Sequence, residues 1–316
     1  MHLVLVGPGA LGSLFAVRLA PHQQEKGNAL FLLDHNPVRA RDLTRTGFSL
    51  QQNDSLFHAS VQVTADPHAI PDCDVLLLCV KAIQVRDALL HAAPLITKNT
   101  LVIGMQNGMA HLDALLNTAG IAAAATSSVG ATLTAPGRVL FGGAGLTRFG
   151  LLAGKIPVPE ILGEVVSLFT RAGIEAELVD DIYACLWQKL FINVGINALT
   201  AIHGRKNGWL LTTDPIKNIM KEAVAEAVAV AKAKNISIST DPLAETFSVC
   251  EKTKENISSM LQDVRNKRPT EIEAINGYIV KEGAKFGIPT PVNRELVRQV
   301  LEIEQSRQDV YVNKKK

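Results

Sequence analysis

The sequence contains few cysteines, and none of them is spaced to bind a metal or to build a disulfide framework. The 316 residues include four cysteines, with no C-x-x-C pair and no histidine nearby at metal-ligand spacing. The eight histidines are scattered along the chain. We therefore expect buried free thiols in a reducing cytoplasm, and no metal site.

Charge of one sign and long apolar runs are also scarce. The net charge is +2 without a long basic stripe, which argues against nucleic acid as a partner. Residues 3–20 are apolar but lack the basic start of a signal peptide, and no uncharged run elsewhere reaches transmembrane length. We expect a soluble, cytoplasmic protein that does not bind a membrane. Its length and its 47% of hydrophobic residues allow two ordered domains.

The chain opens with a nucleotide-binding pattern. Residues 2–6 (HLVLV) predict a buried parallel strand, and residues 13–19 predict a helix. Between them lies a G-x-G-x-x-G fingerprint, whose glycines would allow a tight turn, close approach of a pyrophosphate, and close packing of helix on strand. The alternative is a plain glycine-rich turn. The predicted cofactor-binding residues of this turn are Gly7, Pro8, Gly9, Ala10, Leu11 and Gly12.

An acidic residue ends the second predicted strand, residues 29–33. Asp34 follows Gly12 by 22 residues, close to the ~20 expected for the residue that binds the adenine ribose. A carboxylate there accepts hydrogen bonds from the ribose hydroxyls and repels a 2′-phosphate, which favours NADH over NADPH. Arg39 and Arg41 follow closely enough to reach a 2′-phosphate, and Asp34 can instead begin a turn with Asn36 and Pro37.

Two more buried strands, residues 74–80 and 100–105, end in polar residues. Ligands of open α/β sheets bind at the carboxyl ends of strands, so Lys81, Gln84 and Asn107 are predicted to lie near the cofactor. Asn107 and Gly108 are equally typical of a turn. The β-rich stretch 122–152 is expected to complete the sheet, followed by a helix over 158–172 and a strand over 175–179. The predicted fold of residues 1–180 is a Rossmann-type α/β domain.

Helical periodicity replaces the strand pattern in residues 181–316, which we assign to a second, all-helical domain. The apolar content of this domain suggests dimerisation. The expected helices cover residues 182–202, 214–234, 241–251, 254–263, 270–287 and 292–306.

A polar stripe interrupts the first of these helices. Lys189, Asn193 and Asn197 recur at steps of four, so they share one face of a helix that is otherwise apolar. A lysine in such surroundings is costly to bury without a partner. The residues alone allow a substrate pocket or a polar seam between helices. Further along, Thr270 and Glu273 have capping-box spacing, which would put Glu271 in the first helical turn, where acids are common.

Together these segments resemble the ketopantoate reductase (2-dehydropantoate 2-reductase) family over essentially the whole chain. The motifs that carry the resemblance are Gly7-x-Gly9-Ala-Leu-Gly12, Val80-Lys81-Ala-x-Gln84, Gln106-Asn107-Gly108-Met109, Leu186-Trp-x-Lys189-x3-Asn193-x3-Asn197, Asn256-Ile-Ser-Ser259 and Arg268-x-Thr-Glu271. The resemblance implies a second domain like the helical domain of 6-phosphogluconate dehydrogenase.

The resemblance also implies roles for individual residues. Lys189 matches the family's general acid, and Glu271 matches the acid of the active site, which also contacts the cofactor. Asn107 matches a residue that touches both nicotinamide and substrate, and Ala131 matches a cofactor contact across a small insertion. The positions that match substrate contacts are Asn107, Asn193, Asn197, Asn207, Asn256, Ser258 and Ser259.

The implied reaction is reduction of 2-dehydropantoate to (R)-pantoate by NAD(P)H. NADPH is the family's default cofactor, and many members have arginine where this chain has Asp34, so the aspartate favours NADH. One alternative is a reductase of another branched 2-oxo acid, or an opine-type dehydrogenase, on the same scaffold. The other is a dinucleotide-binding module without catalysis, which would have no need of Lys189 and Glu271 together.

Overall fold

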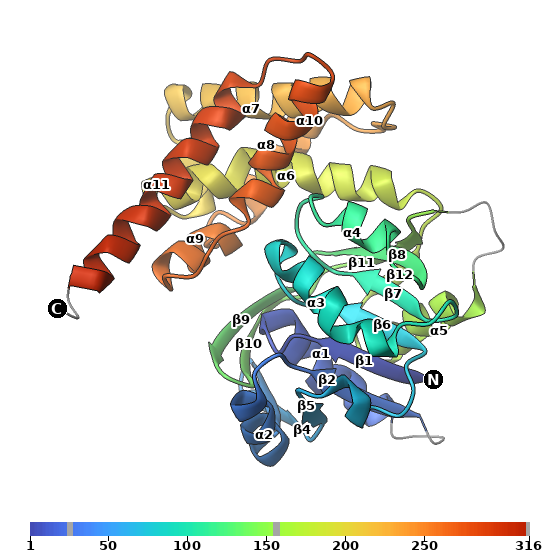
Figure 1. Ribbon diagram of the computed structural model, residues 1–316. Helices are drawn as coiled ribbons and strands as arrows, with labels where there is room; N and C mark the ends of the chain where they lie inside the picture. The colour runs from blue at the N-terminus through green and yellow to red at the C-terminus, as the bar shows by residue number, and fades with distance from the viewer. Residues whose placement is uncertain (24–27, 154–158, 314–316) are drawn as a thin grey trace. The chain divides into compact units, whose positions relative to one another are not determined.

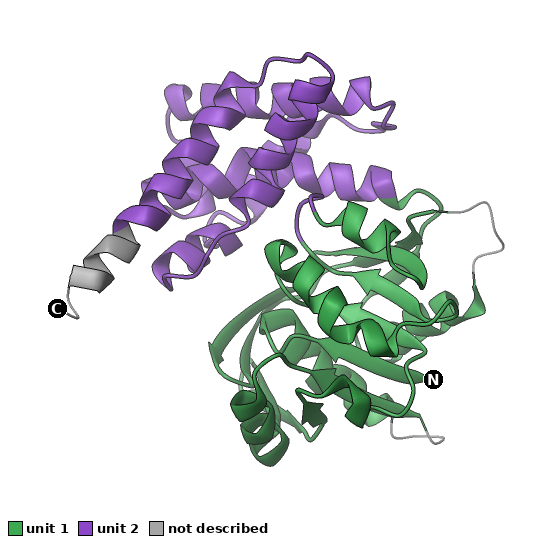
Figure 2. Cartoon of the chain, viewed as in Figure 1, with its two compact units in different colours: residues 1–106, 111–182 green, residues 107–110, 183–316 purple. Residues whose placement is uncertain are grey.

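A computed structural model describes residues 1–23, 28–153 and 159–313. The chain divides into two compact units (Figure 2). Unit 1 contains residues 1–106 and 111–182, and unit 2 contains residues 107–110 and 183–316. Unit 1 is α/β and unit 2 is helical, which confirms the predicted fold class (Figure 1).

The main sheet of unit 1 has eight strands in the order β12-β11-β8-β7-β6-β1-β2-β5. The six neighbouring strands β8, β7, β6, β1, β2 and β5 are parallel to one another, and β11 is antiparallel to β8. The chain runs from β1 to β2 on one side and returns to β6 on the other, so the switch point lies at the carboxyl ends of β1 and β6. The strands are β1 (His2–Val6), β2 (Ala29–Leu33), β5 (Gln62–Thr64), β6 (Val75–Leu78), β7 (Leu101–Gly104), β8 (Ile121–Ser127), β11 (Thr147–Leu151) and β12 (Ala176–Leu178).

Aromatic packing joins helices to the sheet. Phe169 meets Phe15 and Phe149 edge to face, with both pairs of ring centroids 5.0 Å apart. Strands β1, β6 and β7 are buried almost throughout, as expected of central parallel strands. The helices of unit 1 are α1 (Ala10–Gln23), α2 (Pro37–Thr46), α3 (Val85–Ala92), α4 (Leu112–Leu116) and α5 (Glu160–Arg171), with 3-10 turns η2 (Pro67–Ala69), η3 (Ala82–Gln84) and η4 (Ala93–Leu95).

A second sheet corrects one expectation. Residues 122–152 were expected to complete the main sheet, which is right for β8 and β11. It is wrong for β9 (Gly130–Ala135) and β10 (Arg138–Gly143), which join β3 (Phe48–Gln52) and β4 (Ser55–Ala59) in the order β4-β3-β10-β9. The pairing of β10 with β3 joins residues about ninety positions apart in the sequence. The alternation of apolar and polar residues along a strand does not indicate which strand will pair with it. The part of the helix expected over 158–172 that precedes residue 159 lies outside the described residues.

Unit 2 is built around α6 (Ile182–His203), whose first residue belongs to unit 1. A Cβ at Gly195 would lie 2.7 Å from Thr246 Cγ2 and 3.1 Å from Val224 Cγ2, so this glycine lets two other helices pack closely against α6. By length and composition α6 could span a membrane, but 67% of its most apolar window is buried in the protein, which makes it a core helix. The other helices are η5 (Asn207–Leu211), α7 (Asp214–Ala233), α8 (Pro242–Lys252), α9 (Ser259–Arg265), η6 (Ile272–Ala274), α10 (Asn276–Lys285) and α11 (Pro291–Asn313).

The helix expected over residues 270–287 is interrupted. It consists of η6 and α10, with Ile275 between them at φ −104° and ψ −90°. The hydroxyl of Thr270 accepts from Ile272 N, so the predicted capping box with Glu273 does not form. The carbonyl of Ala274 accepts from Met109 N at 3.1 Å. In a continuous helix this carbonyl would instead accept from a backbone N–H four residues further along the chain. Glu271 therefore precedes a short 3-10 turn and does not lie in the first turn of a long helix.

Candidate active site

The fingerprint turn has the geometry that its glycines require. Gly7 has φ +97°, and a Cβ there would lie 2.6 Å from Val80 Cγ1. A Cβ at Gly12 would overlap the carbonyl oxygen of Gly7. Protein packing alone therefore explains two of the three glycines.

The middle glycine is different, because no protein atom would crowd a side chain there. A Cβ at Gly9 would approach only Cys79 O, at an ordinary 3.6 Å. Helix α1 begins at Ala10, so its N-terminal N–H groups and dipole lie at this turn. A bare backbone beside a helix N-terminus suits a pyrophosphate, and the turn therefore fits a dinucleotide. Pro8, Ala10 and Leu11 lie in the same turn.

Asp34 lies at the end of β2, where its backbone N–H bonds to Thr64 O at 2.9 Å. Its side chain is fully buried, and both carboxylate oxygens accept from Arg39, through Nε and Nη2 at 2.6 Å each. The hydrogen bond to Asp34 raises the pKa of Arg39. Asn36, in the predicted turn, caps α2 by accepting from Val38 N and Arg39 N. The pair of Asp34 with Arg39 was not predicted from the sequence.

Lys81 and Gln84 lie just beyond β6. Lys81 is half-buried and precedes η3, while Gln84 is exposed and accepts from Lys81 N through Oε1 at 3.3 Å. Ala131 lies on β9 in the second sheet, where it pairs with Phe141 of β10.

Lys189 lies half-buried in the middle of α6. Burial lowers its pKa from 10.5 to about 8, while the negative charge of Glu271 acts in the opposite direction. The polar stripe therefore has a charge partner on a separate segment of unit 2. A lysine in this state is mostly protonated at pH 7 and gives up its proton more readily than a solvated one.

Asn107 is held by the same carboxylate. Its Nδ2 donates to Glu271 Oε2 at 3.0 Å. The neighbouring Gly108 has φ +74°, and a Cβ there would overlap the carbonyl oxygen of Ala274. The segment 107–110 therefore packs tightly beside Glu271, and the structure brings Asn107, Glu271 and Lys189 together within unit 2.

The two asparagines of α6 continue the stripe from Lys189. Asn193 is half-buried and Asn197 is buried. One turn on, the hydroxyl of Thr200 bonds to the carbonyl of Asn197 at 2.9 Å and to Ser258 Oγ at 2.6 Å. Ser258 also caps α9 by accepting from Leu261 N. Thr200 was not predicted as a site residue. It lies three residues after Asn197, so the helical spacing of the stripe would have placed it next to that asparagine.

The remaining predicted substrate contacts lie at the start of η5 and in the segment that joins α8 to α9. Asn207 is buried, its Nδ2 donates to Thr253 Oγ1 at 2.8 Å, and its backbone N–H donates to Asn256 O at 3.0 Å. Its Oδ1 is buried and has no hydrogen-bond partner among the described residues. Asn256 and Ser259 are exposed.

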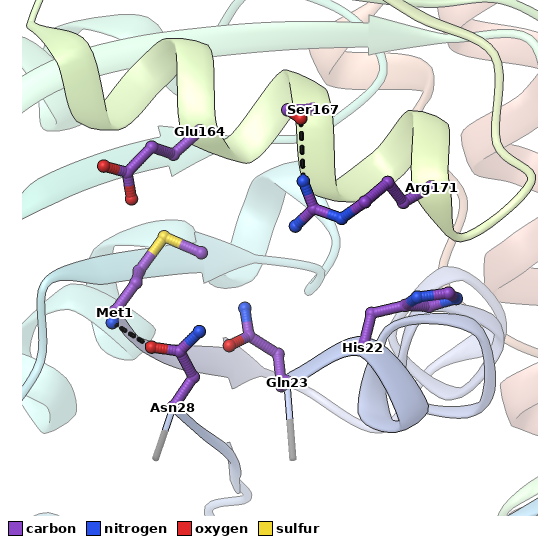
Figure 3. A pocket seen from close by; sticks show the side chains of 7 residues that line it. All are labelled: Met1, His22, Gln23, Asn28, Glu164, Ser167 and Arg171. Atoms are coloured by element: carbon purple, nitrogen blue, oxygen red, sulfur yellow. Dashed lines mark hydrogen bonds between the residues drawn. The ribbon is translucent and has the colours of Figure 1, made fainter. Parts of the chain in front are cut away.

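A cavity of about 220 Å³ lies within unit 1 (Figure 3). Met1 and Asn28 precede β1 and β2, so the cavity is at the amino ends of the strands, opposite the fingerprint. None of its lining residues was predicted as a site residue. In the described ranges no three His, Cys, Asp or Glu residues are grouped to hold a metal ion. The lining residues are Met1, His22, Gln23, Asn28, Glu164, Ser167 and Arg171.

Two family models match the chain. Residues 3–154 match ketopantoate reductase PanE/ApbA, and residues 181–304 match its C-terminal part. A 2-dehydropantoate 2-reductase of Vibrio cholerae serotype O1 is 34% identical over 312 residues, which cover 97% of this chain and 99% of the relative.

Solved structures agree with these matches. The crystal structure of a PanE/ApbA family ketopantoate reductase from Ralstonia eutropha JMP134 has a TM-score of 0.88 and 29% identity, covering 98% of this chain and 100% of that one. A ternary structure of D-mandelate dehydrogenase with NADH and anilino(oxo)acetate has a TM-score of 0.86 and 26% identity, covering 97% and 99%. The predicted family is thus confirmed: the chain belongs to the ketopantoate reductase family of NAD(P)H-dependent oxidoreductases.

Proposed function

We propose that this enzyme reduces 2-dehydropantoate to (R)-pantoate. The observation that carries the proposal is the group formed by Lys189, Glu271 and Asn107 in unit 2, with Asn193 and Asn197 further along α6. NAD(P)H supplies the hydride when bound. The residues of this chain supply charge stabilisation, a proton and the orientation of the substrate.

Lys189 has the properties of the general acid. Negative charge grows on the ketone oxygen as the carbon is reduced, and an ammonium group aimed at that oxygen stabilises the charge and then donates the proton from Nζ. Burial makes the proton easier to give up, and Glu271 keeps the lysine charged beforehand. Glu271 also orients Asn107 by accepting its amide proton.

The amides and hydroxyls of unit 2 suit the rest of the substrate. Asn193 and Asn197 can donate hydrogen bonds without adding charge, as a carboxylate and a hydroxyl require beside a cationic lysine. Asn207, whose Nδ2 already donates to Thr253, is assigned to the substrate by the family resemblance. We assign Asn256, Ser258 and Ser259 to the same surface, by the family resemblance. Ser258 already bonds Thr200, so it acts by fixing the end of the stripe as well as by touching the substrate.

The reaction is tested by measuring oxidation of NADH and NADPH, side by side, with a panel of 2-oxo acids. We expect 2-dehydropantoate to have the highest kcat/KM. The likeness to D-mandelate dehydrogenase supports a second candidate, a reductase of another 2-oxo acid on this scaffold. A kcat/KM at least tenfold higher for an aromatic or another branched 2-oxo acid would replace the first candidate with the second. No turnover of any 2-oxo acid, with the cofactor bound, would favour the non-catalytic module.

We further propose that Asp34 gives the enzyme a preference for NADH. The substitution Asp34→Arg is expected to shift the ratio of kcat/KM values toward NADPH by about tenfold or more, because it introduces a phosphate-binding guanidinium at the end of β2. It also releases Arg39 from its ion pair, which adds a second cation near the ribose.

The matched control for this preference is Asp42→Arg, which makes the same charge change at an exposed position of α2. An unchanged ratio in Asp34→Arg, or an equal shift in both variants, would remove Asp34 from the recognition site. The cytoplasmic location and the homodimer remain predictions.

A further inference from the structure

The side-chain amide of Gln106 holds the chain where it leaves β6. Strands β6 and β7 lie side by side, and Gln106 follows the end of β7 (Figure 1). The residue is 4% exposed, and its Nε2 donates to Leu78 O at 2.7 Å and to Val80 O at 3.0 Å. Both N–H groups of the amide are thus used, one on the last residue of β6 and one on the bend after it. Neither a carboxylate nor an aliphatic side chain can make these bonds.

The held segment, residues 79–80, supports the fingerprint turn. Cys79 N donates to Val6 O at 2.8 Å. A Cβ at Gly7 would lie 2.6 Å from Val80 Cγ1, and one at Gly12 would lie 3.2 Å from Cys79 Cβ. Because the glycine turn packs directly against residues 79–80, we expect a displacement of these residues to move the turn. Lys81, a predicted cofactor contact, comes next in the chain.

The oxygen of the same amide is buried and has no hydrogen-bond partner among the described residues. A Cβ at Gly104 would lie 2.9 Å from Gln106 Oε1 and 3.4 Å from Cδ2 of His111, which places both side chains against this glycine. His111 is also buried, and burial lowers its pKa to about 4, so the ring is neutral at physiological pH. An uncharged amide suits this position, because burying a carboxylate beside a neutral imidazole would be costly.

We propose that Gln106 is a positioning residue of the dinucleotide site. Its amide fixes residues 79–80, and through them it sets both the fingerprint turn and the start of the turn that holds Lys81 and Gln84. The inference rests on the proposed role of these two segments in binding NAD(P)H, and it does not depend on which 2-oxo acid is reduced.

The test is the dissociation constant of NADH and of NADPH, measured by nicotinamide fluorescence without substrate. Gln106→Leu and Gln106→Glu, which remove both donors, are expected to raise the Kd of the preferred cofactor by about tenfold or more, since sub-ångström displacement of a binding turn is costly. Gln106→His keeps one donor and is expected to fall between these variants and the wild type. Saturating cofactor should restore most of kcat.

The matched control is Gln23→Leu, because Gln23 is a similarly buried glutamine, 1% exposed, at the end of α1, where it lines the cavity at the amino ends of the strands. It is expected to leave the Kd within twofold of the wild type, even if the melting temperature falls. A Kd within twofold in the Gln106 variants, or an equal rise in Gln23→Leu, would overturn the inference, as would a wild-type chain that binds neither cofactor. Should Gln106→Leu fail to fold, the same limits apply to Gln106→His. Because no 2-oxo acid is present, failure of the proposed reaction would leave this result unchanged.

Discussion

Lys189→Ala is expected to lower kcat by roughly 10³-fold or more, while the Kd of the nicotinamide cofactor stays within a few-fold of the wild type. In the proposed mechanism this variant loses both the cation that stabilises the developing alkoxide and the proton that neutralises it, and these contributions are large in enzymes. The cofactor fingerprint is in unit 1, whereas Lys189 is in unit 2, so cofactor binding should survive. Single-turnover rates with 2-dehydropantoate, beside fluorescence titration of the cofactor, measure the two effects separately.

The control for Lys189 is Lys217→Ala, which removes a lysine from α7 in the same unit, where it pairs with Asp214. This variant is expected to keep wild-type kcat. A Lys189→Ala enzyme whose steady-state rate stays within a few-fold of the wild type would end the assignment of this lysine as the general acid. Equal losses in the two variants would point to a general effect of removing charge.

The pH profile of Glu271→Gln is the second result with a large expected effect. In the proposed mechanism the protonated lysine is the active form, so kcat/KM is expected to be level on the acid side and to fall as the pH rises through about 8. The charge of Glu271 raises the pKa of Lys189, so its removal should move this alkaline limb to lower pH. At pH 8 the loss should be several-fold, because a smaller fraction of Lys189 is then protonated. Glutamine can still accept from Asn107 Nδ2, so the substitution mainly removes the charge.

Glu245→Gln is the matched control for this profile. Glu245 is a half-buried carboxylate on α8 that accepts from Gln188, the residue beside Lys189. Its replacement should leave the alkaline limb in place. If Glu271→Gln keeps the wild-type limb, or if Glu245→Gln shifts it equally, Glu271 does not set the charge of Lys189.

Local features were the ones that could be predicted from the sequence. The fingerprint needs glycines within six residues, and the structure gives Gly7 a positive φ and leaves no room for a Cβ at Gly12. The polar stripe depends on the 3.6-residue period of α6, which is likewise a local property. These patterns were sufficient for the fold class and for the family.

Features that depend on distant partners were missed or wrongly predicted. The interruption at Ile275 accompanies the bond from Met109 N to Ala274 O, between segments more than 150 residues apart. The placement of β10 beside β3 is of the same kind. The pair of Asp34 with Arg39 joins nearby residues, but the sequence did not show that the carboxylate would be buried.

The amino-acid sequence by itself determined that this chain has a dinucleotide-binding turn, a helical second half and a lysine–asparagine stripe. Each of these features depends on residues that are close together in the sequence, within one or two helical turns of each other. Only the tertiary structure decided that Glu271 faces Lys189 and holds Asn107, and that the Gln106 amide ties β7 to the end of β6. Such contacts form when packing brings together groups far apart in the chain, and burial then gives their charges and hydrogen bonds the strength they lack in water.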